Sequence, residues 1–120
     1  MTVTAETPDE AEVFTSRIAE ARRVMAEVKA STWPTSREAM AAIGQACDYA
    51  TAEAGVYVRL VSGDMDWTEF DGDLWFFGSD PQREAVIIAE ARVLDAARAA
   101  MSRLAEYRRR EAAMSERRAA

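Results

Sequence analysis

Apolar residues recur at helical spacing along the first thirty residues. Thr7-Pro8-Asp9-Glu10 is typical of a helix start, because a capping hydroxyl precedes a proline and acids then face the positive end of the helix dipole. Pro34 disfavours a helical Trp33, so the pattern predicts a helix that ends near Ser31. Its apolar face repeats every three or four residues, at Ala11, Phe14, Ile18, Ala21, Met25 and Val28.

A second helix is predicted directly after this stop. Thr35-Ser36-Arg37-Glu38 matches the capping box, in which Glu38 reaches back to the cap. Gly55 is a typical C-terminal stop. The short link between the two helices predicts an antiparallel helical hairpin. Its apolar face again has the three-to-four spacing, at Met40, Ile43, Cys47, Ala50 and Ala54.

The central segment has the composition of strands. Residues 56–61 read Val-Tyr-Val-Arg-Leu-Val and are bounded by Gly55 and Gly63, which favours a strand. Asp71-Gly72 is a favoured two-residue hairpin turn, and it separates residues 67–70 from residues 73–77. The sequence therefore predicts a three-stranded antiparallel meander.

A long helix is predicted for the C-terminal part. Asp80-Pro81 repeats the cap-then-proline signature, and neither Gly nor Pro occurs from residue 82 to residue 120. The helix would run from residue 81 to about residue 113. Its apolar stripe is longer than a domain of this size covers by itself, so we expect a homodimer whose self-association seam includes Ile87, Leu94, Met101 and Leu104.

These elements predict an α+β fold in the order α-α-β-β-β-α. We expect a flexible N-terminus at residues 1–8, a single domain at residues 9–113 and a frayed basic C-terminal tail at residues 114–120. A hydrophobic fraction of 49% and a charged fraction of 30% are typical of a globular protein. With one cysteine, no signal peptide and no long apolar run, we expect a cytoplasmic protein.

The composition also argues against several kinds of chemistry. Histidine is absent, Lys29 is the only lysine, and the five glycines stand singly, so we expect no enzyme and no cofactor. Residues 64–75 do not fit a calcium loop, because Glu69 stands at the glycine position and Trp75 at the terminal acid, so we expect no metal site. The net charge of −6 disfavours non-specific binding to nucleic acids or anionic membranes.

Residues 64–77 combine aromatic and acidic side chains. Both faces of the predicted hairpin would be apolar, and helices of the same chain could cover both. The alternative, on which the leading hypothesis for function rests, is that one face docks a partner protein with a basic or apolar surface, in a regulatory, inhibitory or assembly role. The arginine-rich composition without asparagine suggests a GC-rich, for example phage, genome. The predicted partner-binding residues are Trp67, Phe70, Trp75, Phe77, Asp64, Asp66, Asp71 and Asp73.

Two other functions fit the same composition. An acidic nucleic-acid mimic would present carboxylates where phosphates sit and would inhibit a DNA-binding protein or a nuclease; steep weakening of its complex with salt would distinguish it. A structural subunit of a larger particle would interlock through the long helix. The arginine-rich C-terminal residues are only a weak indication of nucleic-acid binding, because glutamates are mixed among them.

Overall fold

The protein is helical. The computed structural model describes residues 10–72, 74 and 80–119 of the chain. In this part it contains the helices α1 (Glu10–Ala30), α2 (Arg37–Ser62) and α3 (Pro81–Ala119), one 3₁₀ turn, η1 (Trp67–Glu69), and no strand. The predicted α+β class with a three-stranded meander is therefore wrong.

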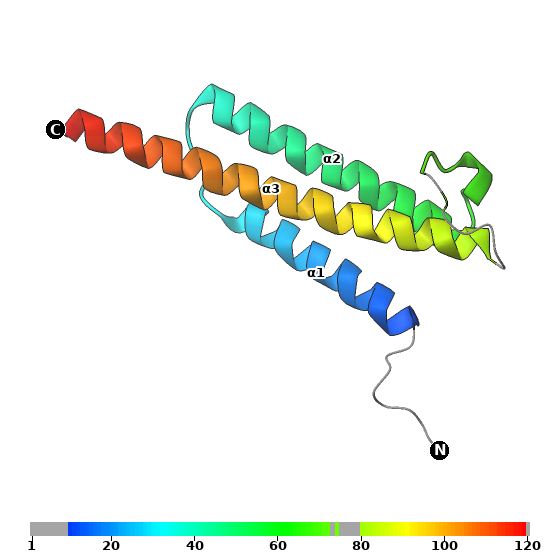
Figure 1. The fold of residues 1–120 in the computed structure, drawn as a ribbon. Helices are drawn as coiled ribbons and strands as arrows, with labels where there is room; N and C mark the ends of the chain where they lie inside the picture. Colours follow the sequence, from blue (N-terminus) through cyan, green and yellow to red (C-terminus); the bar gives the residue numbers. More distant parts are fainter. Residues whose placement is uncertain (1–9, 73, 75–79, 120) are drawn as a thin grey trace, which may run out of the picture.

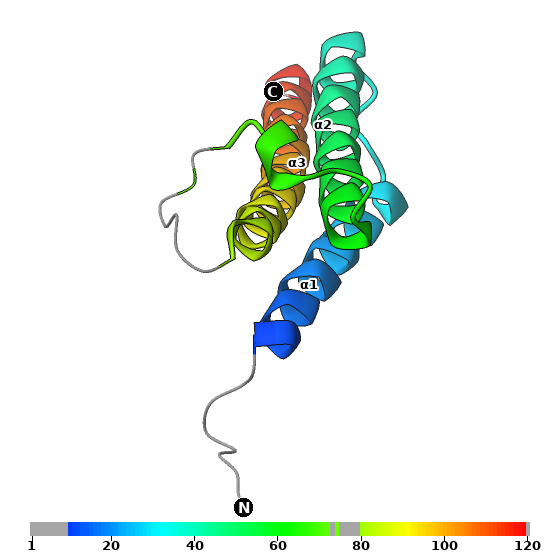
Figure 2. The ribbon, with the colours of Figure 1, turned by 90° about the vertical axis from the view of Figure 1, so that its right-hand side faces the viewer.

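The long helix α3 organises the other elements. Both α1 and α2 pack against α3, and Figure 1 shows the C-terminal end of α3 extending beyond them. Figure 2 is turned by 90° from Figure 1 and shows the segment after α2, with η1, crossing in front of α3. The molecule is elongated, with principal extents of 65 × 37 × 22 Å.

The predicted strand at residues 56–61 is instead the last part of α2. Gly55 does not end the helix, although a glycine inside a helix costs about 1 kcal/mol relative to alanine. Leu60 is buried against Ala85 and Ala89 of α3, and Val56 and Tyr57 pack on the same cluster. This burial at helical spacing outweighs the strand preference of valine, which depends strongly on context. The helix ends at Gly63, whose φ of 86° is the left-handed cap conformation.

The predicted hairpin turn at Asp71-Gly72 is also absent. Gly72 does not have the positive φ that this hairpin turn requires. The residues before it form the 3₁₀ turn η1, because Asp66 and Glu69 make a reciprocal capping box. The Asp66 carboxylate accepts from the backbone N–H of Thr68 at 3.2 Å, and Glu69 accepts from the backbone N–H of Asp66 at 2.9 Å.

The helix starts and ends follow local signals in most places. The first helix ends at Ala30, as predicted, and α3 begins at Pro81 after Asp80. The proposed cap of α1 at Thr7 and Pro8 lies outside the described residues. The cap of α2 is one residue later than predicted: Ser36 accepts from the backbone N–H of Ala39 at 3.1 Å.

The core consists of three clusters along α3. Buried alanines of α3 allow close approach of the other helices. The helix α3 also holds the link between α1 and α2, because Arg108 donates twice to the carbonyl oxygen of Thr32, at 3.1 and 2.7 Å. The first cluster joins α1 to α3, and its buried residues are Ile18, Ala21, Val24, Val93, Leu94 and Ala97. The second joins all three helices through Val28, Ile43, Cys47, Ala100 and Leu104.

The four residues of the predicted self-association seam lie in or beside this core. Leu94 and Leu104 are buried, and Ile87 and Met101 are half-buried. The other helices of the same chain therefore cover Leu94 and Leu104, which a second copy cannot contact in this fold. Homodimer formation stays a prediction, and sedimentation velocity over a range of protein concentrations would test it.

Candidate partner-binding site

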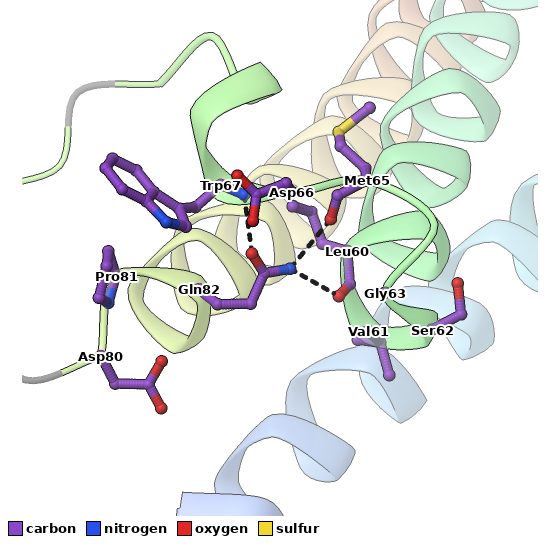
Figure 3. A pocket seen from close by; sticks show the side chains of 10 residues that line it. All are labelled: Leu60, Val61, Ser62, Gly63, Met65, Asp66, Trp67, Asp80, Pro81 and Gln82. Atoms are coloured by element: carbon purple, nitrogen blue, oxygen red, sulfur yellow. Dashed lines mark hydrogen bonds between the residues drawn. The ribbon is translucent and has the colours of Figure 1, made fainter.

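A surface pocket lies at the end of the helix pair where α2 stops and α3 begins. Its volume is about 440 Å³. Figure 3 shows the side chain of Gln82 pointing from α3 toward the end of α2 and the segment that follows it. The described residues that line it include two aspartates and neither lysine nor arginine; they are Leu60, Val61, Ser62, Gly63, Met65, Asp66, Trp67, Asp80, Pro81 and Gln82.

Gln82 fixes the geometry of the pocket. Its Nε2 donates to the carbonyl oxygens of Leu60 and Met65, each at 3.0 Å, and its Oε1 accepts from the backbone N–H of Trp67 at 2.7 Å. One side chain of α3 thus pairs with the Leu60 carbonyl group at the end of α2 and with two backbone groups of the connection, which has no regular ladder of its own. The pocket wall is held in place by these bonds (Figure 3).

Two aspartates of the pocket also cap helical turns. Asp66 caps η1, and hydrogen bonds from the hydroxyl and the backbone N–H of Thr68 lower the pKa of its carboxyl. Asp80 caps α3, because its Oδ1 accepts from the backbone N–H of Arg83 at 3.1 Å. Both side chains remain exposed. Asp66 stays ionised at neutral pH and adds negative charge to the pocket.

The predicted partner-binding residues do not form one surface in the structure. Asp66 and Trp67 line the pocket, with Trp67 half-buried, and Asp64 is exposed on the same connection but does not line the pocket. Phe70 is buried, with 8% exposure, in the cluster that joins α2 and α3. Asp71 pairs with Arg92 of α3 at 2.9 Å. Trp75, Phe77 and Asp73 lie outside the described residues.

Sequence reasoning missed Gln82 and gave Asp80 only its role as a cap. A signal for Asp80 was present, since the cap-then-proline pair placed it at the first turn of α3. No local pattern marked Gln82, because the carbonyl groups that it binds belong to residues 17 and 22 positions earlier.

The single cysteine contributes to packing. Cys47 is buried in the cluster of Val28, Ile43 and Leu104, in agreement with its interpretation as a core residue. Burial raises the pKa of its thiol, so the reactive thiolate is disfavoured. Among the described residues, no group of three His, Cys, Asp or Glu is placed to hold a metal ion. None of the described helices is long and apolar enough to cross a membrane.

Comparisons with protein-family models, with curated proteins and with solved structures found no match to this chain. The pocket geometry and the chemistry of its side chains are therefore the basis for a function.

Proposed function

We propose that this protein is a non-enzymatic protein-interaction module, and that its pocket binds a basic side chain of a partner protein. The composition of the pocket carries the proposal: the exposed carboxylates of Asp66 and Asp80 stand on the same pocket as the half-buried ring of Trp67. A cation placed between carboxylates and an indole gains charge-assisted hydrogen bonds and a cation–π interaction.

The backbone adds to this preference for a cation. The pocket lies at the C-terminus of α2, where carbonyl groups carry the negative end of the helix dipole. The N-terminus of α3 is also close, but the Asp80 carboxylate accepts one of its N–H groups and offsets its positive potential. Asp64 and Asp66 form no ion pair with a described residue, so neither charge is neutralised within this part of the chain.

The rim of the pocket supplies an apolar contact. Val61 lines the pocket and is 56% exposed, and Pro81 stands at the start of α3. A partner segment that carries an arginine or lysine next to an apolar side chain therefore matches the site. Because the sequence holds no histidine, the commonest general base, we assign binding rather than catalysis to the pocket.

A charge placed on the rim tests the proposal without disturbing the core. Val61→Arg introduces a cation at the pocket, and Val58→Arg is its matched control, because Val58 is 55% exposed one turn earlier on α2 and does not line the pocket. The probes are eight-residue peptides with one arginine flanked by apolar residues, and the same peptides with glutamine in place of arginine.

Titrations followed by ¹H–¹⁵N spectra would measure binding to the full chain. We expect the arginine peptides to shift the indole N–H of Trp67 and the side-chain amide of Gln82, and Val61→Arg to weaken the affinity by about tenfold or more, which corresponds to at least 1.4 kcal/mol. Val58→Arg should stay within about twofold of the native chain on the same scale. Equal binding of the glutamine peptides, or equal weakening by both variants, would contradict the proposal.

The acidic mimic has less support. Carboxylates on the helices lie beside arginines, as in the pairs Glu20–Arg98 and Glu106–Arg110. This pairing offsets their charge, so these surfaces lack the continuous array of free carboxylates that would imitate phosphates. We therefore do not advance that function. A cation bound in the acidic pocket would also be weakened by salt, as an acidic mimic would. Comparison of Val61→Arg with Val58→Arg therefore distinguishes the pocket from the mimic better than salt does.

A further inference from the structure

Glu90 is a buried carboxyl group in the N-terminal third of α3. Its side chain has 0% exposure, and neither carboxyl oxygen accepts a hydrogen bond from any group that the structure describes. Burying an ionised carboxylate without such partners is costly, and the cost disappears when the group is neutral. The position is therefore compatible with a protonated Glu90 and unfavourable for an ionised one.

The groups that face Glu90 come from both other helices. Burial raises the pKa of Glu90 to about 7, although the Arg17 guanidinium of α1 favours the ionised form and lowers the pKa in part. Tyr57 faces it from α2, with Arg22 of α1 near the phenol. Burial, followed by the Glu90 charge, raises the pKa of Tyr57, so this side chain stays a neutral phenol.

The packing of α1 is less extensive than that of α2. The backbone of α1 lies close to α3 and hardly approaches α2, whereas α2 and α3 are close along much of their length. Gln82 also connects α3 to the end of α2 through Leu60, and no comparable side chain ties the described part of α1 to α2. Release of α1 would expose Ile43 and Cys47 of α2, which pack with Val28, but the longer contact between α2 and α3 would stay in place.

We propose that Glu90 makes the docking of α1 on α3 sensitive to pH: when its carboxyl group loses the proton, the opening equilibrium shifts toward a state in which α1 is detached while α2 and α3 stay paired. The neutral acid can remain buried beside Ile18, Val93 and Leu94. The carboxylate is solvated when α1 lifts away, and this gain favours the detached state. The contacts between α1 and α3 weaken as the pH rises through neutrality.

Amide hydrogen exchange of the full chain tests this proposal. The measured quantity is the opening equilibrium constant of amides 18–28, corrected for the intrinsic exchange rate. It should rise about tenfold between pH 6 and pH 8, because the pKa of Glu90 is near its ordinary value when α1 is detached and near neutrality when α1 is docked. The opening equilibria of core amides in α2 and α3 should change much less. Glu90→Gln should make the α1 values independent of pH over this range.

Two further variants keep the result interpretable. Glu20→Gln removes a carboxylate that pairs with Arg98 between the same helices, and this control should keep the native pH dependence. Glu90→Met fills the site with an apolar side chain of similar length and should abolish the dependence if Glu90→Gln does not fold. The proposal is overturned if α1 opening in the native chain does not change with pH. It is equally overturned if α1 and α3 open together, or if a folded Glu90 variant retains the response.

Discussion

The guanidinium of Arg92 lies over the ring of Phe70, with its Cζ 4.9 Å from the ring centroid. The same guanidinium pairs with Asp71 at 2.9 Å. One arginine of α3 therefore holds two consecutive residues of the segment that follows η1. This contact turns Phe70 inward to the core and leaves the half-buried Trp67 as the described aromatic residue of the pocket.

Gly72 is required by this arrangement, because a Cβ at that position would overlap the Phe70 ring and approach the Arg92 guanidinium. We expect Gly72→Ala to lower the free energy of unfolding by about 1–3 kcal/mol, as measured by urea denaturation. Gly55→Ala is the matched control: its Cβ would meet open space within α2, so it should stabilise the protein by up to about 1 kcal/mol. Equal effects of the two substitutions would contradict the packing described for Phe70.

Gln82→Leu should destabilise the wall of the pocket. The substitution keeps the approximate size of the side chain but leaves the Met65 carbonyl group and the Trp67 N–H without their partner. It also removes one of the two donors to the Leu60 carbonyl group, which still accepts from the backbone N–H of Gly63. We expect a loss of about 2–3 kcal/mol in denaturant unfolding, together with faster exchange of the Trp67 amide. Gln45→Leu, at an exposed position of α2, should change stability little. Unchanged protection of the Trp67 amide would show that Gln82 does not hold this segment.

Glu90 should make the whole protein less stable as the pH rises. The folded state binds the Glu90 proton up to about pH 7, whereas the ordinary pKa is 4.5, so the folded state holds more protons between these values and stability falls with rising pH. The decrease begins near the ordinary pKa and levels off above neutrality. We expect it to reach up to about 3 kcal/mol.

Denaturant unfolding from pH 5 to pH 8 would measure this decrease, which should be absent from Glu90→Gln. Asp66 affects stability only at lower pH, because its pKa is lowered in the folded state. Its contribution to the free energy of unfolding is present above the ordinary pKa of 3.8 and is lost as the pH falls through the folded pKa. A native chain whose stability rises from pH 5 to pH 8 relative to Glu90→Gln would contradict the prediction.

Arg108 should stabilise the link between α1 and α2. Its two hydrogen bonds to the Thr32 carbonyl oxygen join this link to the C-terminal part of α3. We expect Arg108→Ala to cost about 1 kcal/mol in thermal or urea unfolding. The control Arg109→Ala removes the same charge from the neighbouring, exposed position and should have almost no effect. Similar losses for the two variants would assign the effect to charge rather than to the contact with Thr32.

The helix boundaries show which parts of the fold could be predicted. The end of α1 and the start of α3 follow from proline and capping residues, whose effects act within one turn. Residues 56–61 could not be assigned in this way, because a short apolar run fits a strand or a buried helix equally well. The contact of Leu60 with Ala85 and Ala89, which are 25 and 29 residues further along the chain, favours the helix over the strand.

The candidate site was also predicted in part. The run of acids and aromatics drew attention to Asp66 and Trp67, but the same run suggested a hairpin that does not form. For Glu90 a signal existed and was overlooked. Ile87, Glu90, Leu94, Ala97 and Met101 alternate spacings of three and four, so the carboxyl group stands within an apolar stripe of α3.

The sequence by itself determined where two of the helices start or stop and which side of each helix is apolar, because these properties depend on residues within one or two turns. The tertiary structure alone decided that Gln82 supports the pocket, that Phe70 is buried, and that Glu90 of α3 is enclosed by the packing of the other helices. Each of these outcomes depends on groups that are distant in sequence and meet only when the helices pack, and it is that packing which removes water from the carboxyl group of Glu90.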